Sequence, residues 1–345
     1  MKKRVIAVMT AMMLATTLLA GCGGGDAPSG GGDYEGETFV MRCAYDVPAG
    51  GSMARAIEKF EELVKADPEL SQVVDVQLFP GGQLFAANET MDATLRGDVE
   101  LGMFTTWYAD SILPYSSTFD LPLLFNDVEQ MIDFVENSEL VKDVWAPFEE
   151  VGGHCFGGTV TGEYGILSAK KAVEKPEDVK GLLIRSVGDG SLTWLALGAN
   201  PINMSAGDIF TGLQRGTIDA ADIGPISVKD RNLYEVADHY LNTFFHSTLS
   251  IYVVNKDWWD QLPADVSAKL EDYMKEAISY CNGFVSEDME VALKLMEENG
   301  ITNYKPTSEE RQAWKDSVQD VYQELGYDKM GAEFTDALLE WVENN

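Results

Sequence analysis

The chain has 345 residues, of which 45% are hydrophobic and 24% charged, and its formal net charge at neutral pH is −32. This length and apolar content are enough to bury the core of one large domain or of two smaller ones. The acidic excess argues against nucleic acid or an anionic lipid surface as the partner, because both repel negative charge.

The amino terminus has the pattern of a lipoprotein signal. Three basic residues at 2–4 precede an apolar stretch over 5–18 that is too short to span a bilayer, and LAGC at 19–22 resembles a lipobox. We expect residues 1–21 to be a signal peptide, Cys22 to carry lipid, and the glycine-rich segment 22–37 to be a flexible tether. The folded part would then be held at a membrane surface, in the periplasm or on the cell surface. An ordinary secretory signal with a chance cysteine is the alternative.

Three further cysteines, Cys43, Cys155 and Cys281, stand far apart and form no Cys-x-x-Cys pair. An odd number at this spacing indicates neither a disulfide framework nor a zinc site. We expect them to be buried as small apolar side chains.

Strands over 39–45, 74–78 and 100–104 alternate with helices over about 52–66 and 84–96. The β-α-β-α-β order predicts a parallel, doubly wound sheet, as in one lobe of a binding protein. Tyr45 closes the first strand, and Trp107 and Tyr108 follow the third. Aromatic side chains at that edge either build a pocket wall or fill the core, and the sequence leaves both open.

The middle of the chain reads as a helix capped by Asp127 with Gln130 in the capping-box position, a second helix over about 139–150, and strands over 155–160 and 165–168. Here the chain is expected to cross into a second lobe. Farther on, a helical pattern over 263–299 would extend roughly 50 Å, long enough to brace both lobes. Two helices, about 308–325 and 328–342, close the chain.

The segment 181–225 carries the most telling residue. Arg185 directly follows the apolar run Leu182–Ile184, at the edge where open α/β sheets bind ligands. Next come a helix from about Ser191 to Gly198, a helix over 208–215 capped by Ser205 and ended by Gly216, and a strand over 219–222. A planar guanidinium at such an edge suits a carboxylate, and the alternative role of Arg185 is a structural salt bridge.

Six segments match a known family in order: FPGGQL at 79–84, DLPLLF at 120–125, KPEDVKGLLIR at 175–185, LGANPINM at 197–204, IFTGLQRGTIDAAD at 209–222 and NKDWWDQLPADV at 255–266. The chain thereby resembles the solute receptors of tripartite ATP-independent periplasmic (TRAP) transporters. This resemblance implies a two-lobe α/β fold with doubly wound sheets, connecting strands and a long lobe-spanning helix. Lobe I would comprise 38–162 and 251–290, and lobe II 163–250 and 291–345.

The resemblance also implies a function and a site. The receptor would close on a small organic acid, with Arg185 bound to its carboxylate, and deliver it to the membrane permease. An ABC importer or a sensor kinase is the alternative partner.

The segment DAADIGP at 219–225 departs from two family patterns, D-G-Q-E-N-P and D-A-A-E-W-V-G-P, and lies nearer the second. Receptors with the second pattern resemble those for 2-oxo and 2-hydroxy acids that hold a cation beside the ligand. By this resemblance Asp222 takes the place of one metal ligand, Glu163 or Tyr164 that of another, and Phe245 and His246 that of the third. Two oxygen ligands do not make a calcium cage, so no cofactor is expected. A cation at Asp222 and Glu163 is the weaker alternative.

No lysine or arginine stands at 163–164, where relatives that bind diacids place a second cation. The expected ligand is therefore a monocarboxylate, such as a 2-oxo or 2-hydroxy acid. Aromatic walls from Tyr164, Trp107, Tyr108, Trp194 and Phe245 would also suit an aromatic acid, and His246 could line the same pocket.

Enzyme signatures are incomplete. The Ser-x-x-Lys at 168–171 has no Lys-Thr-Gly partner, and the glycines at 157–162 lack a P-loop lysine. The three histidines form no His-Glu-x-x-His motif. The chain is not expected to be an enzyme.

Overall fold

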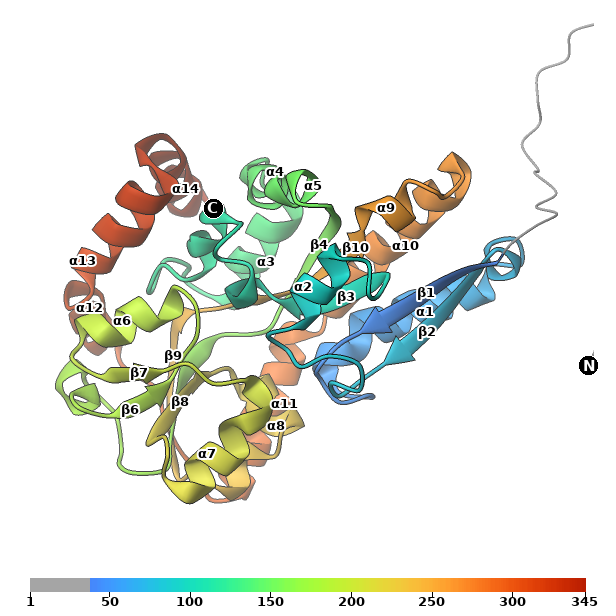
Figure 1. Cartoon of the computed structure of the whole chain (residues 1–345). Coiled ribbons are helices and arrows are strands. Elements are labelled where there is room, and N and C mark those ends of the chain that lie inside the picture. The colour runs from blue at the N-terminus through green and yellow to red at the C-terminus, as the bar shows by residue number, and fades with distance from the viewer. Residues whose placement is uncertain (1–37) are drawn as a thin grey trace, which may run out of the picture. The chain divides into compact units, whose positions relative to one another are not determined.

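The computed structural model describes residues 38–345, so the expected signal peptide, Cys22 and the tether lie outside the described residues. Within that range the first sheet has five strands in the order β2-β1-β3-β10-β4 (Figure 1). The three amino-terminal strands are parallel, as predicted, whereas β10 runs antiparallel to both of its neighbours. The strands are β1 (Phe39–Ala44), β2 (Val74–Phe79), β3 (Leu101–Thr105), β4 (Gly153–Val160) and β10 (Leu249–Asn255).

The second sheet has six strands in the order β11-β9-β5-β8-β6-β7. Its β8, β6 and β7 are parallel, and β5 is antiparallel to β8 and β9. The strands are β5 (Tyr164–Ser168), β6 (Leu183–Arg185), β7 (Asn200–Ile202), β8 (Ala220–Ile223), β9 (His239–His246) and β11 (Thr302–Tyr304).

The chain crosses between the sheets at residues 161–163, from β4 to β5, and at 247–248, from β9 to β10. Thr161 donates from its backbone N and its hydroxyl to the carbonyl of Thr248, at 3.2 and 2.8 Å. The Ser247 hydroxyl donates to the carbonyl of Gly162 at 2.6 Å. The two crossing segments are thus hydrogen-bonded to one another, which makes them a paired connection between the lobes.

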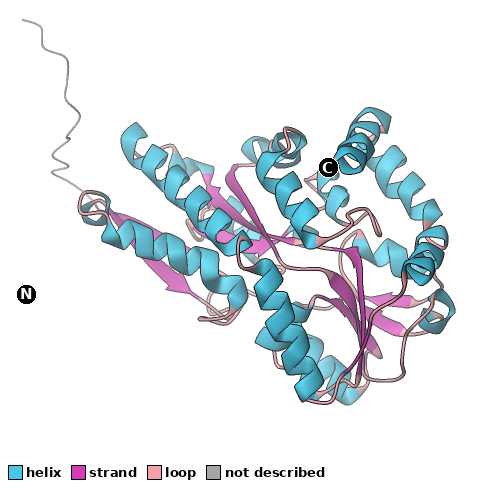
Figure 2. Cartoon of the chain, turned by 180° about the vertical axis from the view of Figure 1, so that it is seen from behind, coloured by secondary structure: helices cyan, strands magenta, loops and turns pink. Residues whose placement is uncertain are grey.

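Helices surround both sheets (Figure 2). They are α1 (Arg55–Ala66), α2 (Thr90–Leu95), α3 (Val128–Asn137), α4 (Leu140–Trp145), α5 (Pro147–Glu150), α6 (Gly190–Ala196), α7 (Ile209–Arg215), α8 (Pro225–Asp230), α9 (Lys256–Trp259), α10 (Ala264–Asn282), α11 (Val285–Glu298), α12 (Ser308–Asp316), α13 (Gln319–Val321) and α14 (Ala332–Asn344).

Several helix predictions hold and others do not. Asp127 caps α3 by accepting from the backbone N of Gln130 at 2.9 Å, as predicted. Gly216 ends α7 at a φ of +68°, also as predicted, but Ser205 makes no side-chain cap. The helix expected over 139–150 is interrupted before Pro147, whose ring cannot donate the next backbone hydrogen bond.

The long helix expected over 263–299 is two helices, α10 and α11, interrupted at Gly283 and Phe284. Asn282 is the last residue of α10, directly before the break. Its side chain is buried, accepts from the backbone N of Val160 at 3.0 Å and donates to Glu136 at 2.9 Å. The end of α10 is therefore tied to the end of β4, where the chain leaves the first sheet.

The carboxyl-terminal elements also differ from expectation. In place of two simple helices there are α12, α13, a π-helix (Tyr322–Met330) and α14. Buried residues such as Val321, Leu325, Phe334 and Leu338 share a core with the first sheet. Part of the segment 291–345 therefore packs against the first lobe. The assignment of the whole segment to lobe II stays a prediction.

Cys43 and Cys281 are buried, Cys155 is half-buried, and all three are free thiols. Among the described residues, no helix combines the length and apolar character that crossing a membrane requires.

Candidate functional site

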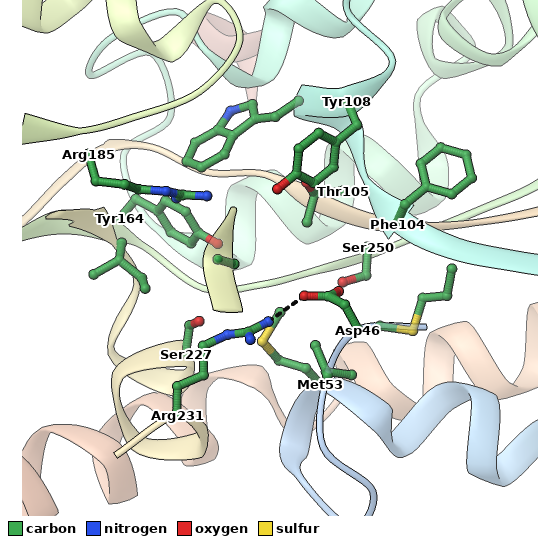
Figure 3. A pocket seen from close by; sticks show the side chains of 15 residues that line it. Asp46, Met53, Phe104, Thr105, Tyr108, Tyr164, Arg185, Ser227, Arg231 and Ser250 are labelled. Carbon is green, nitrogen blue, oxygen red and sulfur yellow. Dashed lines mark hydrogen bonds and ion pairs between the residues drawn. The ribbon is translucent and has the colours of Figure 1, made fainter. Parts of the chain in front are cut away.

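A cavity opens where strands of both sheets end (Figure 3). The first sheet contributes the loop after β1 and the end of β3, which continues into a short 3-10 helix, Thr106–Tyr108. The second sheet contributes β5, β6, β8 and the helix α8. The polar and aromatic residues that line the cavity are Asp46, Phe104, Thr105, Trp107, Tyr108, Tyr164, Arg185, Ser227, Arg231 and Ser250.

Arg185 is buried in this wall, with 3% of its surface exposed. Its Nε donates to the carbonyl of Met204 at 3.0 Å, and its guanidinium carbon lies 5.5 Å from the ring centroid of Trp107. Burial lowers the pKa of Arg185. No carboxylate among residues 38–345 pairs with it, so the structural salt bridge that was its alternative role is not formed. Its two terminal nitrogens remain as donors for an anion.

Three further buried polar atoms in the cavity wall have no hydrogen-bond partner within residues 38–345: Thr105 Oγ1, the Tyr108 hydroxyl and Arg231 Nε. The Tyr108 hydroxyl lies near the backbone N of Ala206 without making a hydrogen bond of normal geometry. Buried polar groups are nearly always paired in a folded protein, so such atoms gathered in one wall point to a missing ligand.

Arg231, directly after α8, is a second cation in the cavity, and it was not predicted. It donates to Asp46 at 2.8 Å across the two lobes, and the side chains are only 11% and 16% exposed. Figure 3 shows this pair on the opposite side of the cavity opening from the Arg185 guanidinium. Arg231 lies one short helix after the carboxyl end of β8. That position is the only feature of the sequence that could have predicted Arg231 as a cavity residue.

Comparison with known proteins identifies the family. Residues 43–329 match the family described as bacterial extracellular solute-binding protein, family 7, known as DctP. The chain belongs to this family.

Curated relatives agree with this assignment. The C4-dicarboxylate-binding periplasmic protein DctP of Rhodobacter capsulatus is 31% identical over 310 residues, which cover 86% of this chain and 89% of the relative. The protein of the same name from Vibrio cholerae is 28% identical and covers 84% and 85%.

Solved structures of TRAP periplasmic solute-binding proteins share the fold. One from Shewanella oneidensis, with bound succinate, superposes with a TM-score of 0.82 at 23% identity and covers 89% of this chain and all of that chain. The sugar acid binding protein of Advenella mimigardefordensis, in complex with galactonate, gives 0.83 at 22% identity, with 89% and 99% covered. This chain is thus a DctP-type TRAP receptor with the two-lobe α/β fold that was predicted.

The structure places four predicted site residues of the receptor in the cavity wall: Trp107, Tyr108, Tyr164 and Arg185. Tyr45 is instead buried in the core of the first lobe. Phe245 is also buried, packed edge-on against Trp194 and Trp314 at 4.9 Å each. Glu163 accepts from the backbone N of Val128 at 3.2 Å, and burial raises its pKa.

Asp222 and His246, also predicted for the site, do not line the cavity but form a buried network behind it. Both are at most 3% exposed. Asp222 accepts from Ser186 at 2.9 Å, from Trp194 at 2.7 Å and from His246 Nε2 at 2.8 Å. The other ring nitrogen of His246 lies 3.4 Å from Asp120. We call Asp120, His246 and Asp222 the buried network.

The carboxylates of the buried network raise the pKa of His246. Burial lowers the pKa of His246, but Asp222 and Asp120 together outweigh it and raise that pKa to about 10, so the ring is an imidazolium. The network reaches the ligand cavity through Trp107, whose Nε1 donates to Asp120 at 2.6 Å and whose ring stacks on His246 at 5.5 Å. The buried network therefore holds Trp107, which is part of the cavity wall, in place.

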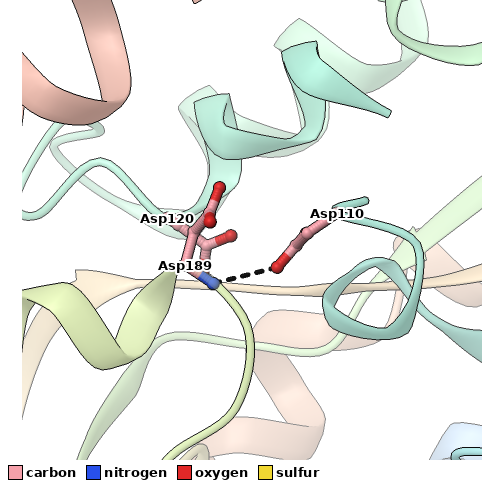
Figure 4. A group of neighbouring side chains, drawn as sticks. All are labelled: Asp110, Asp120 and Asp189. Carbon is pink, nitrogen blue, oxygen red and sulfur yellow. Dashed lines mark hydrogen bonds between the residues drawn. The ribbon is translucent and has the colours of Figure 1, made fainter. Parts of the chain in front are cut away.

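One group of acidic side chains in the described part of the chain is close enough to hold a metal ion. Asp110, Asp120 and Asp189 each place an oxygen within 4.8 Å of the others (Figure 4). The backbone N of Asp189 donates to Asp110 at 2.9 Å, and Lys329 is ion-paired with Asp189. Burial raises the pKa of Asp110 to about 8. The Lys329 ammonium and a proton on Asp110 therefore supply the positive charge that a bound metal ion would bring to this group. Neither Asp222 nor Glu163 belongs to this group.

Proposed function

We propose that this receptor captures a small organic acid and delivers it to the membrane permease of a TRAP transporter. The observation that carries the proposal is Arg185, a buried guanidinium that faces the cavity with no carboxylate partner in residues 38–345. A buried charge without a partner lowers the stability of the fold, and a bound anion offsets that cost. The family match favours a TRAP permease over an ABC importer or a sensor kinase as the partner.

The ligand class we propose is a monocarboxylate that carries hydroxyl or oxo groups. No lysine or arginine stands at 163–164, but Arg231 brings a second cation to the cavity wall from the end of α8. The unpaired Thr105, Tyr108 and Arg231 atoms still call for hydrogen-bonding groups along the body of the ligand, which favours a 2-hydroxy, 2-oxo or sugar acid over an aromatic acid. Similar proteins are described with succinate, galacturonate, erythronate and galactonate.

In the proposed mechanism, the acid enters between the lobes and its carboxylate binds the terminal nitrogens of Arg185. Trp107 lies under the guanidinium and fixes its plane, and the Met204 carbonyl holds its Nε. Closing the lobes removes water, which strengthens the charge-assisted hydrogen bonds. The closed receptor then docks on the permease, and lobe opening releases the acid.

We further propose that the protein acts outside the cytoplasm, anchored in a membrane by lipid on Cys22. The basic, apolar and LAGC segments at 2–22 support this anchoring. Expression of a Cys22→Ala variant tests it. We expect the variant to move from the membrane to the soluble fraction, and membrane retention equal to that of the wild type would contradict the proposal.

The function is tested by a thermal-shift screen of the wild-type receptor against carboxylic acids, with and without chelator, followed by calorimetric titration of each acid that binds. Removing one partner of a buried charged pair costs on the order of 2–5 kcal/mol, so Arg185→Ala should weaken binding at least about 30-fold. Arg96→Ala, at a surface ion pair with Asp98, is the control and should bind as the wild type does. Affinity of Arg185→Ala within threefold of the wild type would refute the site.

A further inference from the structure

The cavity wall holds three formal charges among the described residues that line it: Arg185, Arg231 and Asp46. The two arginines alone would suit a dicarboxylate. Asp46 changes the sum, because its carboxylate is ion-paired with Arg231 at 2.8 Å and leaves a net charge of one positive. A ligand with a single negative charge therefore neutralises the closed cavity.

We propose that Asp46 makes this receptor selective for singly charged, hydroxyl-bearing acids over dicarboxylates of the same length. This inference rests on the proposed function, since it assumes that a ligand carboxylate binds Arg185. The second carboxylate of a diacid would lie beside Asp46 in a partly desolvated wall, where like charges repel strongly. A hydroxyl in the same place carries no such penalty.

The free hydrogen-bonding atoms fit a hydroxyl at this end. Asp46 uses Oδ2 to accept from Arg231, and within residues 38–345 its Oδ1 accepts no hydrogen bond. A hydroxyl can donate to Asp46 and accept from the unpaired Arg231 Nε, whereas a carboxylate can only accept. The adjoining Thr105 and Tyr108 hydroxyls can each donate or accept.

The pair also links charge selection to closure. Asp46 follows β1 in the first lobe and Arg231 follows α8 in the second, so their contact crosses the cavity. Two neighbouring contacts cross at the same place: Lys229 donates to Ser52 at 2.7 Å, and the backbone N of Met53 donates to Asp230 at 3.4 Å. A second ligand carboxylate that drew Arg231 away from Asp46 would break one of the contacts that hold the lobes together.

Matched ligands test the proposal. Galactonate and galactarate share six carbons and four secondary hydroxyls and differ only in a terminal hydroxymethyl or carboxylate group, and erythronate and meso-tartrate form the corresponding four-carbon pair. Calorimetric titration at neutral pH should show the monoanion of a pair binding the wild type at least about tenfold more tightly than the dianion.

Two variants should move this preference in opposite directions. Asp46→Asn keeps the side-chain shape and raises the cavity charge, so the preference should shrink by about tenfold or reverse. Arg231→Gln lowers the cavity charge and should widen it. Glu62→Gln removes a negative charge from an exposed side chain of α1 and should leave the preference unchanged.

The outcomes separate this proposal from the function it rests on. If the wild type binds a dianion as tightly as its matched monoanion, or if the preference is the same in Asp46→Asn and the wild type, the role of Asp46 is wrong and the receptor function stands. If no carboxylic acid of either charge binds the wild type, the proposed function fails and this inference fails with it.

Discussion

The ligand cavity and the buried network behind it are both polar, charged and shielded from water, yet they differ in how their polar atoms are paired. In the network, Asp222 accepts three hydrogen bonds and His246 lies between two carboxylates, and one oxygen of Asp120, Oδ2, has no partner among residues 38–345. In the cavity, Arg185 has no carboxylate partner within residues 38–345, and Thr105, Tyr108 and Arg231 each leave an atom unpaired. Burial alone therefore does not identify a binding residue, whereas several unpaired polar atoms gathered in one cavity wall point to a ligand.

This contrast predicts opposite consequences of mutation. Changes in the network should lower the stability of the protein whether or not ligand is present, because they leave a buried charge without its partner. Changes in the cavity should lower affinity and leave the unliganded protein intact. Variants of the two regions test this division.

Asp222→Ala should lower the free energy of unfolding by about 3–5 kcal/mol, because the His246 imidazolium loses a buried partner. Urea unfolding of the unliganded protein measures this. Asp143→Ala, at an exposed position on α4, is the control and should stay within about 0.5 kcal/mol of the wild type. A loss in Asp222→Ala no larger than in the control would place Asp222 outside the framework of the fold.

Stability should fall as the pH rises from about 4 toward 8. Burial raises the pKa of Asp110 to about 8 and that of Asp120 to about 6. A carboxyl whose folded-state pKa lies above its unfolded value stabilises the protein below the unfolded value and loses that contribution as the pH rises through the folded one. The raised pKa of His246, about 10, extends the loss above pH 6.5.

Unfolding measured across this pH range should show a decrease on the order of 2 kcal/mol or more. Asp110→Asn should reduce the slope between about pH 4 and 8, since asparagine carries no titrating proton, while the Asp120 contribution up to about pH 6 and the His246 contribution above pH 6.5 should remain. A wild-type stability that rises steadily from pH 4 to 8 would contradict the protonation of the acidic group.

Tyr108→Phe and Thr105→Val each remove one hydroxyl from the cavity wall. A neutral hydrogen bond contributes about 0.5–1.5 kcal/mol, so each variant should weaken a hydroxy acid by about two- to tenfold. Titration calorimetry checks this, with Tyr327→Phe, at an exposed tyrosine, as the control. Unchanged affinity in both cavity variants would show that these hydroxyls do not contact the ligand.

The sequence was informative where local pattern sets position. Arg185 could be predicted because a short apolar strand ends at it, and its side chain does face the cavity. The prediction that Asp222 lines the cavity was wrong, because successive side chains of a strand face opposite sides. Within β8, Ile223 lines the cavity and its neighbour Asp222 faces the buried network. The sequence of a strand does not show which of its two faces meets the cavity, so it does not decide between Asp222 and Ile223.

The second half of the site depends on contacts that no local pattern encodes. Asp46 and Arg231 are 185 positions apart, one in a loop and the other after a short helix, and they meet only because the lobes close. The contacts of Asn282 at the end of α10 are similar, because its side-chain hydrogen bonds join it to distant parts of the chain.

We propose that the buried guanidinium of Arg185 binds the ligand and does not stabilise the fold. The stability of unliganded Arg185→Met tests this proposal directly. Methionine fills much of the same space without the charge. We predict a free energy of unfolding equal to or above that of the wild type, because an unpaired buried charge is removed, while carboxylate binding is lost. A loss of about 3 kcal/mol or more without ligand, as expected on breaking a buried ion pair, would show that Arg185 is part of the framework and contradict the account.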